Sequence, residues 1–229
     1  MRSNKFDGIA RAALAAVIMV SLNVLLAGCV AHLPLAQQSP DLPYAAKRAV
    51  AVAVLDERDV LAEGKAPNFI GRAHVSFGIP TDITVYPWYE SDKSKKDHTL
   101  ATALEERIVA GLNDEGWQLS AAGLAKQPTP DEVAVLLGSL GAERLLVLTL
   151  KKWFISLNLN WVSAFNFDWA YNMRIYDSAG IQLVDLSDAG RDVVDEQANQ
   201  SPANHIRLAY RARLIKILER PEVRAALQD

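Results

Sequence analysis

The amino-acid sequence predicts an α+β domain: a single mixed, largely antiparallel sheet with helices packed on one face. Three observations lead to this fold class. Alternating apolar residues mark long strands in the C-terminal half, two stretches with helical apolar spacing lie between strands, and another helical stretch follows the last strand. Half of the residues are hydrophobic, so residues 48–229 suffice for one domain with a sizeable core.

The first 28 residues are predicted to be a signal peptide outside the fold. A basic leader precedes an apolar run that ends in Leu26-Ala27-Gly28-Cys29. The run has about 16 residues, fewer than the roughly 20 of a membrane-spanning helix. The end of the run resembles the lipobox of bacterial lipoproteins. The alternative interpretation is an uncleaved anchor helix whose buried cysteine has no role.

The lipobox resemblance implies cleavage before Cys29, a diacylglyceryl thioether on its sulfur, and an acyl chain such as palmitate on the new amino terminus. Two or more chains hold a protein to a membrane durably. Val30 follows the cysteine, and the absence of Asp there resembles lipoproteins exported to the outer membrane. The expected location is therefore the outer membrane, with the domain facing the periplasm.

Charge and cysteine content exclude some classes of protein. The chain has a formal net charge of −3 that becomes more negative without the basic leader, which argues against a nucleic-acid partner. Cys29 is the single cysteine, so no disulfide is expected. Residues 29–47 carry three prolines among polar residues and are predicted to be the lipidated cysteine and an extended tether, whose removal should not change thermal stability.

The domain begins with one clear strand and one irregular segment. Arg48 to Leu55 is apolar or small on both faces, which predicts a central strand. Residues 56–96 contain glycines and prolines that interrupt every apolar run, yet the segment is too aromatic to be disordered. We predict either a pair of short edge strands over an exposed sheet face or a partner-binding surface, with the candidate residues Phe69, Phe77, Tyr86, Trp88 and Tyr89.

Two helices follow. The first is capped by Asp97 and ends at Gly116, with an apolar stripe facing inward and Glu105, Glu106 and Arg107 facing out. A short strand is expected over 117–119. The second begins with the capping box Thr129-Pro130-Asp131-Glu132 and ends at Gly141, with Val133, Leu136, Leu137 and Leu140 turned inward.

The remaining chain predicts a strand meander and two helices. Strands are expected over 143–157, 161–175 and 181–186, the last two joined by a turn at 177–180. Odd positions of the second strand are apolar and even positions are polar, so Trp169 should be buried against a helix while Asp168 faces water. Helices should begin at Pro202 and Pro221.

These elements resemble a known domain. The first strand ends in Asp-Glu-Arg, the first helix reads Leu-x3-Leu-x3-Ile-x3-Leu before Gly-Trp, and the long hairpin closes on Tyr-Asp-x-x-Gly. The order is similar to the small α/β domain of bacterial outer-membrane lipoproteins such as YajG, to the periplasmic domain of CsgG and to the N-terminal domain of TolB. The pore-forming strands of CsgG have no counterpart of adequate length, so pore formation is not implied.

Catalytic and metal-binding patterns are not found. Ser139 lies one residue out of step with a nucleophile elbow, and the four histidines lack companions at ligand spacing. The acidic run 185–196 matches no calcium loop. Residues 56–59 read as a salt-bridged loop anchor or a binding site, and the basic run 207–220 as a solvated face or a contact for anionic lipid.

Three functions remain open. We expect a non-enzymatic lipoprotein without cofactor or metal that binds another envelope protein or an envelope polymer. The first alternative is a small-molecule or lipid carrier, with residues 161–175 lining an apolar cavity. The second is an envelope hydrolase, which requires a pocket that joins a serine or carboxylate to a histidine.

Overall fold

A seven-stranded sheet organises the part of the chain that the computed structural model describes, residues 33–74, 79–158, 164–195 and 200–229. These residues belong to one compact unit, 32–229. The predicted signal peptide, Cys29 and Phe77 lie outside the described residues. No helix within the described ranges is long and apolar enough to cross a membrane.

Strand β5 (Arg144–Asn158) is the centre of the sheet. One side of β5 pairs antiparallel with β6 (Ala164–Asp177) along its length. The other side pairs in parallel with β1 (Val50–Asp56) through its first half and with β2 (Phe69–His74) through its second half. Because three of the six strand pairings are antiparallel and include the longest, the predicted α+β class is confirmed.

Three strands form the edges. β4 (Leu119–Ala121) pairs with β1, and β3 (Pro80–Thr84) pairs with β2. On the opposite side, β7 (Gln182–Val193) pairs with β6 and is longer than the predicted 181–186. β1 is buried on both faces between β4 and β5, which confirms the predicted central strand.

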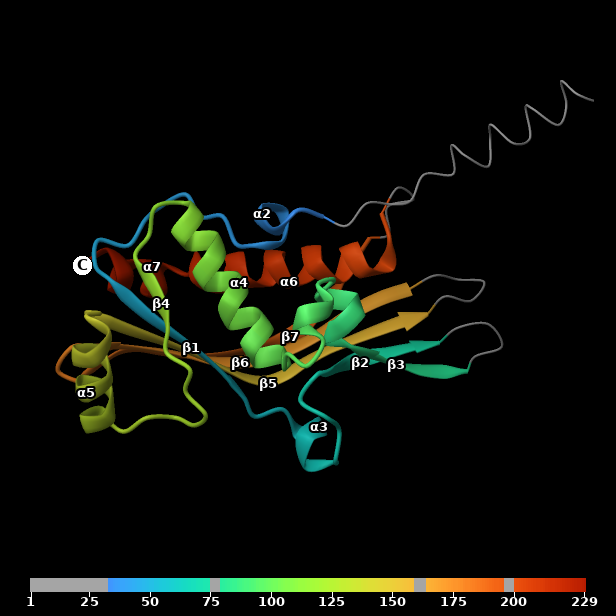
Figure 1. Cartoon of the computed structure of the whole chain (residues 1–229), viewed down its shortest axis with the longest axis horizontal. Coiled ribbons are helices and arrows are strands. Elements are labelled where there is room, and N and C mark those ends of the chain that lie inside the picture. The colour runs from blue at the N-terminus through green and yellow to red at the C-terminus, as the bar shows by residue number, and fades with distance from the viewer. Residues whose placement is uncertain (1–32, 75–78, 159–163, 196–199) are drawn as a thin grey trace, which may run out of the picture. The chain divides into compact units, whose positions relative to one another are not determined.

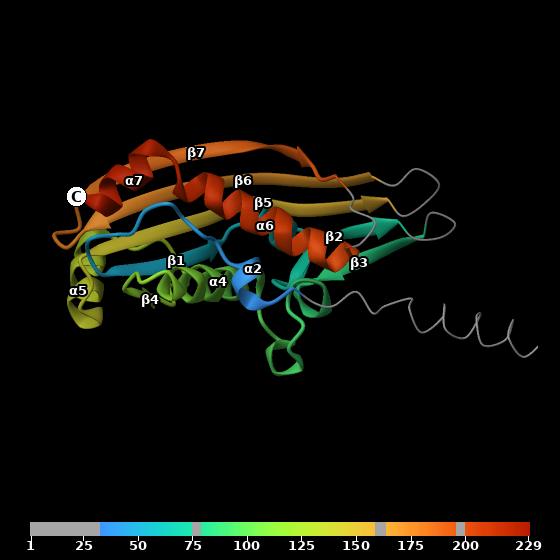
Figure 2. The ribbon, with the colours of Figure 1, turned by 90° about the horizontal axis from the view of Figure 1, so that it is seen from above.

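Most helices cover one face of the sheet, as predicted. α4 (Leu100–Asp114), α6 (Pro202–Leu218) and α7 (Pro221–Gln228) share one apolar cluster with the strands (Figures 1 and 2). α5 (Pro130–Leu140) differs, because it packs on Ala53, Val147 and their neighbours on the other face. The reason is that β1 and the first half of β5 are apolar on both faces, so both must be covered.

The helix starts follow their capping residues. Thr129 and Glu132 form the predicted capping box, and Gly141 ends α5 in the left-handed region at φ 63°. α4 is capped by Thr99, whose side chain accepts a hydrogen bond from the Thr102 amide, and not by Asp97. Threonine supplies the same capping oxygen two residues later.

The polar side of α4 is not solvated as predicted. Of the three charged residues predicted to face out, Glu105 and Arg107 are buried, and Glu106 is partly exposed. Glu105 accepts hydrogen bonds from the amides of Val54, at 2.9 Å, and Gly123, at 3.3 Å. It thereby ties α4 to β1 and to the loop after β4.

The predicted tether packs on the domain instead of running free over residues 33–47. It contains the short helix α2 (Leu35–Gln38), and Leu42 and Tyr44 are buried. The Tyr44 hydroxyl donates to the Leu218 carbonyl at 2.6 Å, and Arg211 Nε donates to the Ser39 carbonyl at 2.7 Å. The prolines that suggested a linker allow an irregular chain that still buries its apolar side chains.

The irregular segment 56–96 contains two short strands, β2 and β3, but they do not form the predicted pair of edge strands over a sheet face. Both extend the sheet: β2 lies between β5 and β3, and only β3 is at an edge. It also contains the short helix α3 (Asp59–Ala62), a helical turn over Val85–Tyr89 and a 3₁₀ turn over Lys93–Lys95. Arg58 is buried and makes two 2.7 Å contacts with Asp56, while its Nη1 donates to the Phe69 carbonyl at 2.7 Å. Residues 56–59 therefore fasten the start of the segment, as the loop-anchor interpretation expected.

Candidate functional site

The five candidate aromatic residues of segment 56–96 have different environments. Phe69 and Tyr89 are buried and belong to the core, so they cannot contact a partner directly. Tyr86 and Trp88 are partly exposed, with exposed Pro87 between them. Phe77 is outside the described residues. The surface that remains is Tyr86–Trp88, called here the aromatic turn.

Tyr89 fixes the end of the aromatic turn in the core. Its ring centroid lies 5.1 Å from that of Tyr210 on α6, and the Arg107 guanidinium lies 5.2 Å from the Tyr89 ring. Burial raises the pKa of the Tyr89 phenol, with Arg107 opposing that shift. The aromatic turn is thus joined to two helices through one buried side chain.

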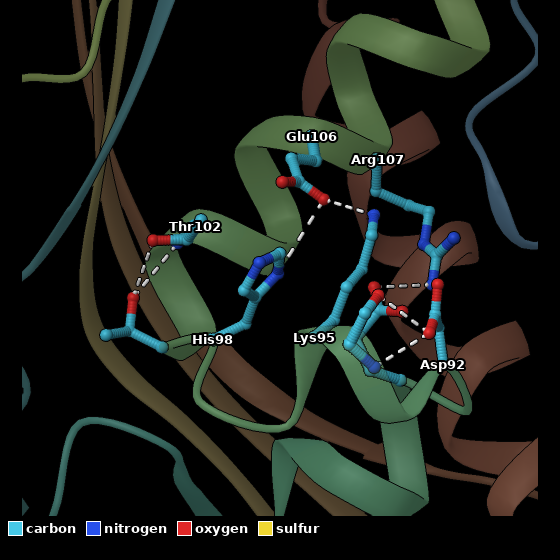
Figure 3. A network of polar contacts seen from close by, with 9 residues as sticks. Asp92, Lys95, His98, Thr102, Glu106 and Arg107 are labelled. Atoms are coloured by element: carbon cyan, nitrogen blue, oxygen red, sulfur yellow. Dashed lines mark hydrogen bonds and ion pairs between the residues drawn. The ribbon is translucent and has the colours of Figure 1, made fainter.

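A buried ion pair holds the backbone after Tyr89. Arg107 Nη2 on α4 lies 2.9 Å from Glu90 Oε1, and both side chains are 6% exposed (Figure 3). Removing one member of such a pair leaves an uncompensated buried charge, which usually costs about 3–5 kcal/mol. Glu90 therefore depends on α4 for its position.

A buried arginine of α6 holds the turn from a second direction. Arg207 Nε donates to the Tyr89 carbonyl at 2.9 Å, and Nη2 lies 3.5 Å from the Pro87 carbonyl. Its Nη1 donates to Asn204 Oδ1 at 2.8 Å. Burial and the nearby Arg107 lower the pKa of Arg207, so this guanidinium is a structural group and not part of a solvated basic face.

Surface contacts continue the attachment towards α4. Asp92 accepts hydrogen bonds from the Ser94 amide and hydroxyl, at 2.8 and 2.7 Å. Lys95 Nζ lies 2.6 Å from Glu106 Oε2, and His98 Nδ1 lies 3.7 Å from the same oxygen (Figure 3). Together with the buried contacts, they hold the aromatic turn in one conformation before any partner binds, which reduces the entropy cost of association.

An apolar groove beside α5 was not predicted. It has a volume of about 600 Å³ and lies between α5 and the loop 123–128. Val135, which is 75% exposed, belongs to its wall. Leu140 was predicted to face inward but is 38% exposed, because Val133, Leu137 and the partly buried Leu136 make the contact with the apolar cluster on this face of the sheet. The uncovered face of α5 has no periodic signal, which is why sequence analysis missed it.

Another pocket, of about 380 Å³, brings a histidine near carboxylates. His205 on α6 lines it with Asp192 and Asp195 at the end of β7. Both Asp192 carboxylate oxygens are bound by Arg213, and the described lining contains no serine or cysteine. The pocket therefore joins a histidine to carboxylates, as the hydrolase alternative requires, but Arg213 already holds the Asp192 carboxylate in an ion pair.

The aromatic strand β6 fills the core. Phe167 packs 5.0 Å from both Trp153 and Tyr210, measured between ring centroids. Trp169 is buried under the Arg213 guanidinium of α6 at 3.6 Å, as predicted. The apolar side chains of the described part of β6 therefore pack in the core and do not line the cavity that the carrier hypothesis expected. Among the described residues no group of three or more potential ligands could hold a metal ion.

Comparison with known proteins gives only distant structural similarity. No protein-family model and no curated relative matches the sequence. Protein XCC0632 from Xanthomonas campestris, of family DUF330, is 9% identical; the match covers 79% of this chain and 91% of that one, with a TM-score of 0.40. Lipoprotein GNA1162 from Neisseria meningitidis is 14% identical, with 78% and 100% coverage and a TM-score of 0.37. The resemblance to YajG and CsgG remains a prediction from sequence.

Proposed function

We propose that this chain is a lipid-anchored envelope protein that binds another envelope protein through the aromatic turn Tyr86–Trp88, without catalysing a reaction. The observation that carries the proposal is the rigid presentation of two partly exposed aromatic residues. Tyrosine and tryptophan are enriched among the residues that supply most of the binding energy at protein interfaces.

The lipid anchor comes from the sequence alone. Cys29 in the lipobox-like Leu26-Ala27-Gly28-Cys29 would carry the lipid, and Val30 favours the outer membrane with the domain in the periplasm. A membrane-held protein meets its partners at a high effective concentration, so a small aromatic surface is enough for useful binding.

A second candidate function is carriage of an apolar small molecule. The groove beside α5 favours it, because about 600 Å³ falls in the range of small-molecule sites and Leu124, Val135 and Leu136 line it. A carrier of this kind should bind a fluorescent fatty acid with one-to-one stoichiometry, and Val135→Asp should abolish that binding.

The test compares two matched surface variants. Tyr86→Ser with Trp88→Ser removes the aromatic turn, and Val135→Ser with Leu140→Ser removes two exposed apolar side chains elsewhere. After crosslinking in the intact envelope, the first variant should lose the partner that wild type retains, and the second should keep it. Circular dichroism and melting temperature should be unchanged in both.

Other outcomes contradict the proposal. If the second variant alone loses the partner, the binding surface is the groove. If the first variant unfolds, Tyr86 and Trp88 are core residues and the segment is a structural flap. If neither variant loses the partner, it binds at another surface.

A further inference from the structure

The outer edge of β7 is unpaired in the part of the molecule that the structure describes. β7 pairs with β6 alone. Val194 N donates to the Phe165 carbonyl at 2.9 Å. In the same register, the even-numbered residues of β7 from Val184 onward form the backbone hydrogen bonds with β6. From Asp185 to Val193, the odd-numbered residues of β7 therefore direct their amides and carbonyls to the open edge; the register shifts at Leu183.

The odd-numbered side chains of β7 lie on the sheet face opposite α6. Asp185 and Arg191 are charged, with exposed side-chain fractions of 44% and 60%. Leu183 and Val193 are apolar and are 43% and 73% exposed. Exposed apolar residues on an open edge strand are unusual, because such edges invite pairing with another chain.

We propose that two copies of this chain pair antiparallel along β7 to form a two-fold dimer with one continuous sheet. With Asp188 on the two-fold axis, Asp185 lies opposite the partner's Arg191. Leu183, at the register shift of β7, lies near the partner's Val193. The centre brings Ser187 opposite the small side chain of the partner's Ala189. The charged residues on this face then lie opposite residues of the other sign, and the larger apolar residues lie near one another.

Charges within each copy extend this complementarity. Arg191 Nε lies 2.5 Å from Asp168, and Asp168 lies 3.4 Å from Lys152. Asp185 lies 3.3 Å from Arg174. Joining the two edges therefore gives a row of alternating charges across both β6–β7 pairs.

The complementarity also selects one register. A shift of two residues, the smallest that keeps the same face, places Asp185 opposite Ala189 or Val193 of the partner. Both charge pairs are then lost, and Leu183 no longer lies near the partner's Val193. In the proposed register Asp188 meets its symmetry mate, and its charge is balanced by Arg220 at 3.3 Å. The Ala189 amide exchanges its 2.9 Å bond to Asp188 for a bond to the partner's strand.

Charge exchange tests the dimer in the full chain, purified in a nonionic detergent. Light scattering at about 10 µM should give twice the chain mass for wild type, while Arg191→Asp and Asp185→Arg should each give the monomer mass. A mixture of the two variants should restore the dimer, since each interface pair again has opposite charges. Arg72→Asp, at the other side of the sheet, is the matched control and should remain dimeric.

A cysteine substitution gives an independent readout. Asp188→Cys should form a disulfide-linked dimer, because opposed residues in a non-hydrogen-bonded pair have Cα atoms about 4.5 Å apart. Leu183→Cys should not, since the two copies of residue 183 are separated by ten residues of strand, about 34 Å at roughly 3.4 Å per residue. A monomeric wild type, or folded charge variants whose mixture stays monomeric, overturns the proposal. If the charge variants unfold, failure of Asp188→Cys to crosslink overturns it. The Tyr86→Ser and Trp88→Ser variant should stay dimeric, which separates this edge from the aromatic turn.

Discussion

Arg107→Met is the most informative perturbation of the aromatic turn. It keeps most of the side-chain volume but removes the only charge that contacts Glu90 in the described structure. At 2.9 Å and an effective dielectric constant of about 20, the lost attraction is about 6 kcal/mol before desolvation is counted. The desolvation of the two charges offsets part of this attraction, so the free energy of unfolding should fall by about 3–5 kcal/mol.

Urea unfolding followed by circular dichroism measures this loss. Glu90→Gln should also destabilise the protein, and the double variant should lose less than the sum of the two single variants, because the second change removes a charge that is already unpaired. Hydrogen exchange supplies a local readout: the Glu90 amide, which donates to the Val85 carbonyl at 2.8 Å, should exchange faster in Arg107→Met.

Strictly additive losses would falsify the reasoning, because they would show no coupling between Glu90 and Arg107. A loss below about 1 kcal/mol would mean that the pair behaves like an exposed one. Unchanged exchange at Glu90 would mean that Arg207 and Tyr89 hold the aromatic turn without α4.

Four other predictions test separate parts of the structure. Trp169→Ala should cost about 3–5 kcal/mol of unfolding free energy, while Asp168→Ala should cost about 1 kcal/mol, since its carboxylate faces the other side of β6; equal losses in urea titrations would contradict the strand assignment. Tyr44→Phe should cost about 1 kcal/mol by removing its buried hydrogen bond, and an unchanged stability would restore the view that residues 33–47 are a tether. Burial raises the pKa of Glu105 above 4.5, although two amide donors act in the opposite direction. The contribution of Glu105 to stability is therefore fully present below the unfolded pKa and is lost as pH rises through the folded pKa. Denaturant titrations from pH 3.5 to 7 should show wild type losing stability relative to Glu105→Gln, and the opposite slope would refute the burial. Cys29→Ser should remain an unprocessed precursor without lipid, and mass spectrometry showing a free thiol in the wild-type protein would exclude the lipobox assignment.

Local signals predicted the strands and helices well. Alternation in β6 placed Trp169 in the core, and the capping box at Thr129 placed the start of α5. Both signals depend on neighbours in the sequence, so they survive without knowledge of the tertiary fold.

Contacts between distant segments could not be predicted in this way. Glu105 and Arg107 follow the pattern of a solvated helix face, but an amide of β1 and the carboxylate of Glu90 satisfy them in the interior. The same limit applies to Tyr44, whose partner is 174 residues away. A polar side chain is buried only where the fold places a hydrogen-bonding or charged partner beside it. The periodicity of the sequence carries no information about that partner.

The candidate site was predicted as a segment and not as a surface. Composition selected five aromatic residues in 56–96, but it could not separate Tyr89, which is in the core, from Trp88, which is partly exposed. The groove beside α5 and the complementary edge of β7 were missed, because each depends on which side of an element remains uncovered after folding.

Site-specific photocrosslinking from position 86 tests the central claim most directly. A photoreactive amino acid replaces Tyr86 in the full chain, and adducts formed in the intact envelope are identified by mass spectrometry. The account predicts one discrete protein adduct that disappears when Trp88→Ser is added and does not form from Ile181, an exposed residue outside the aromatic turn. The same adduct from both positions, or an adduct at 86 that persists in Trp88→Ser, would contradict a binding role for the aromatic turn.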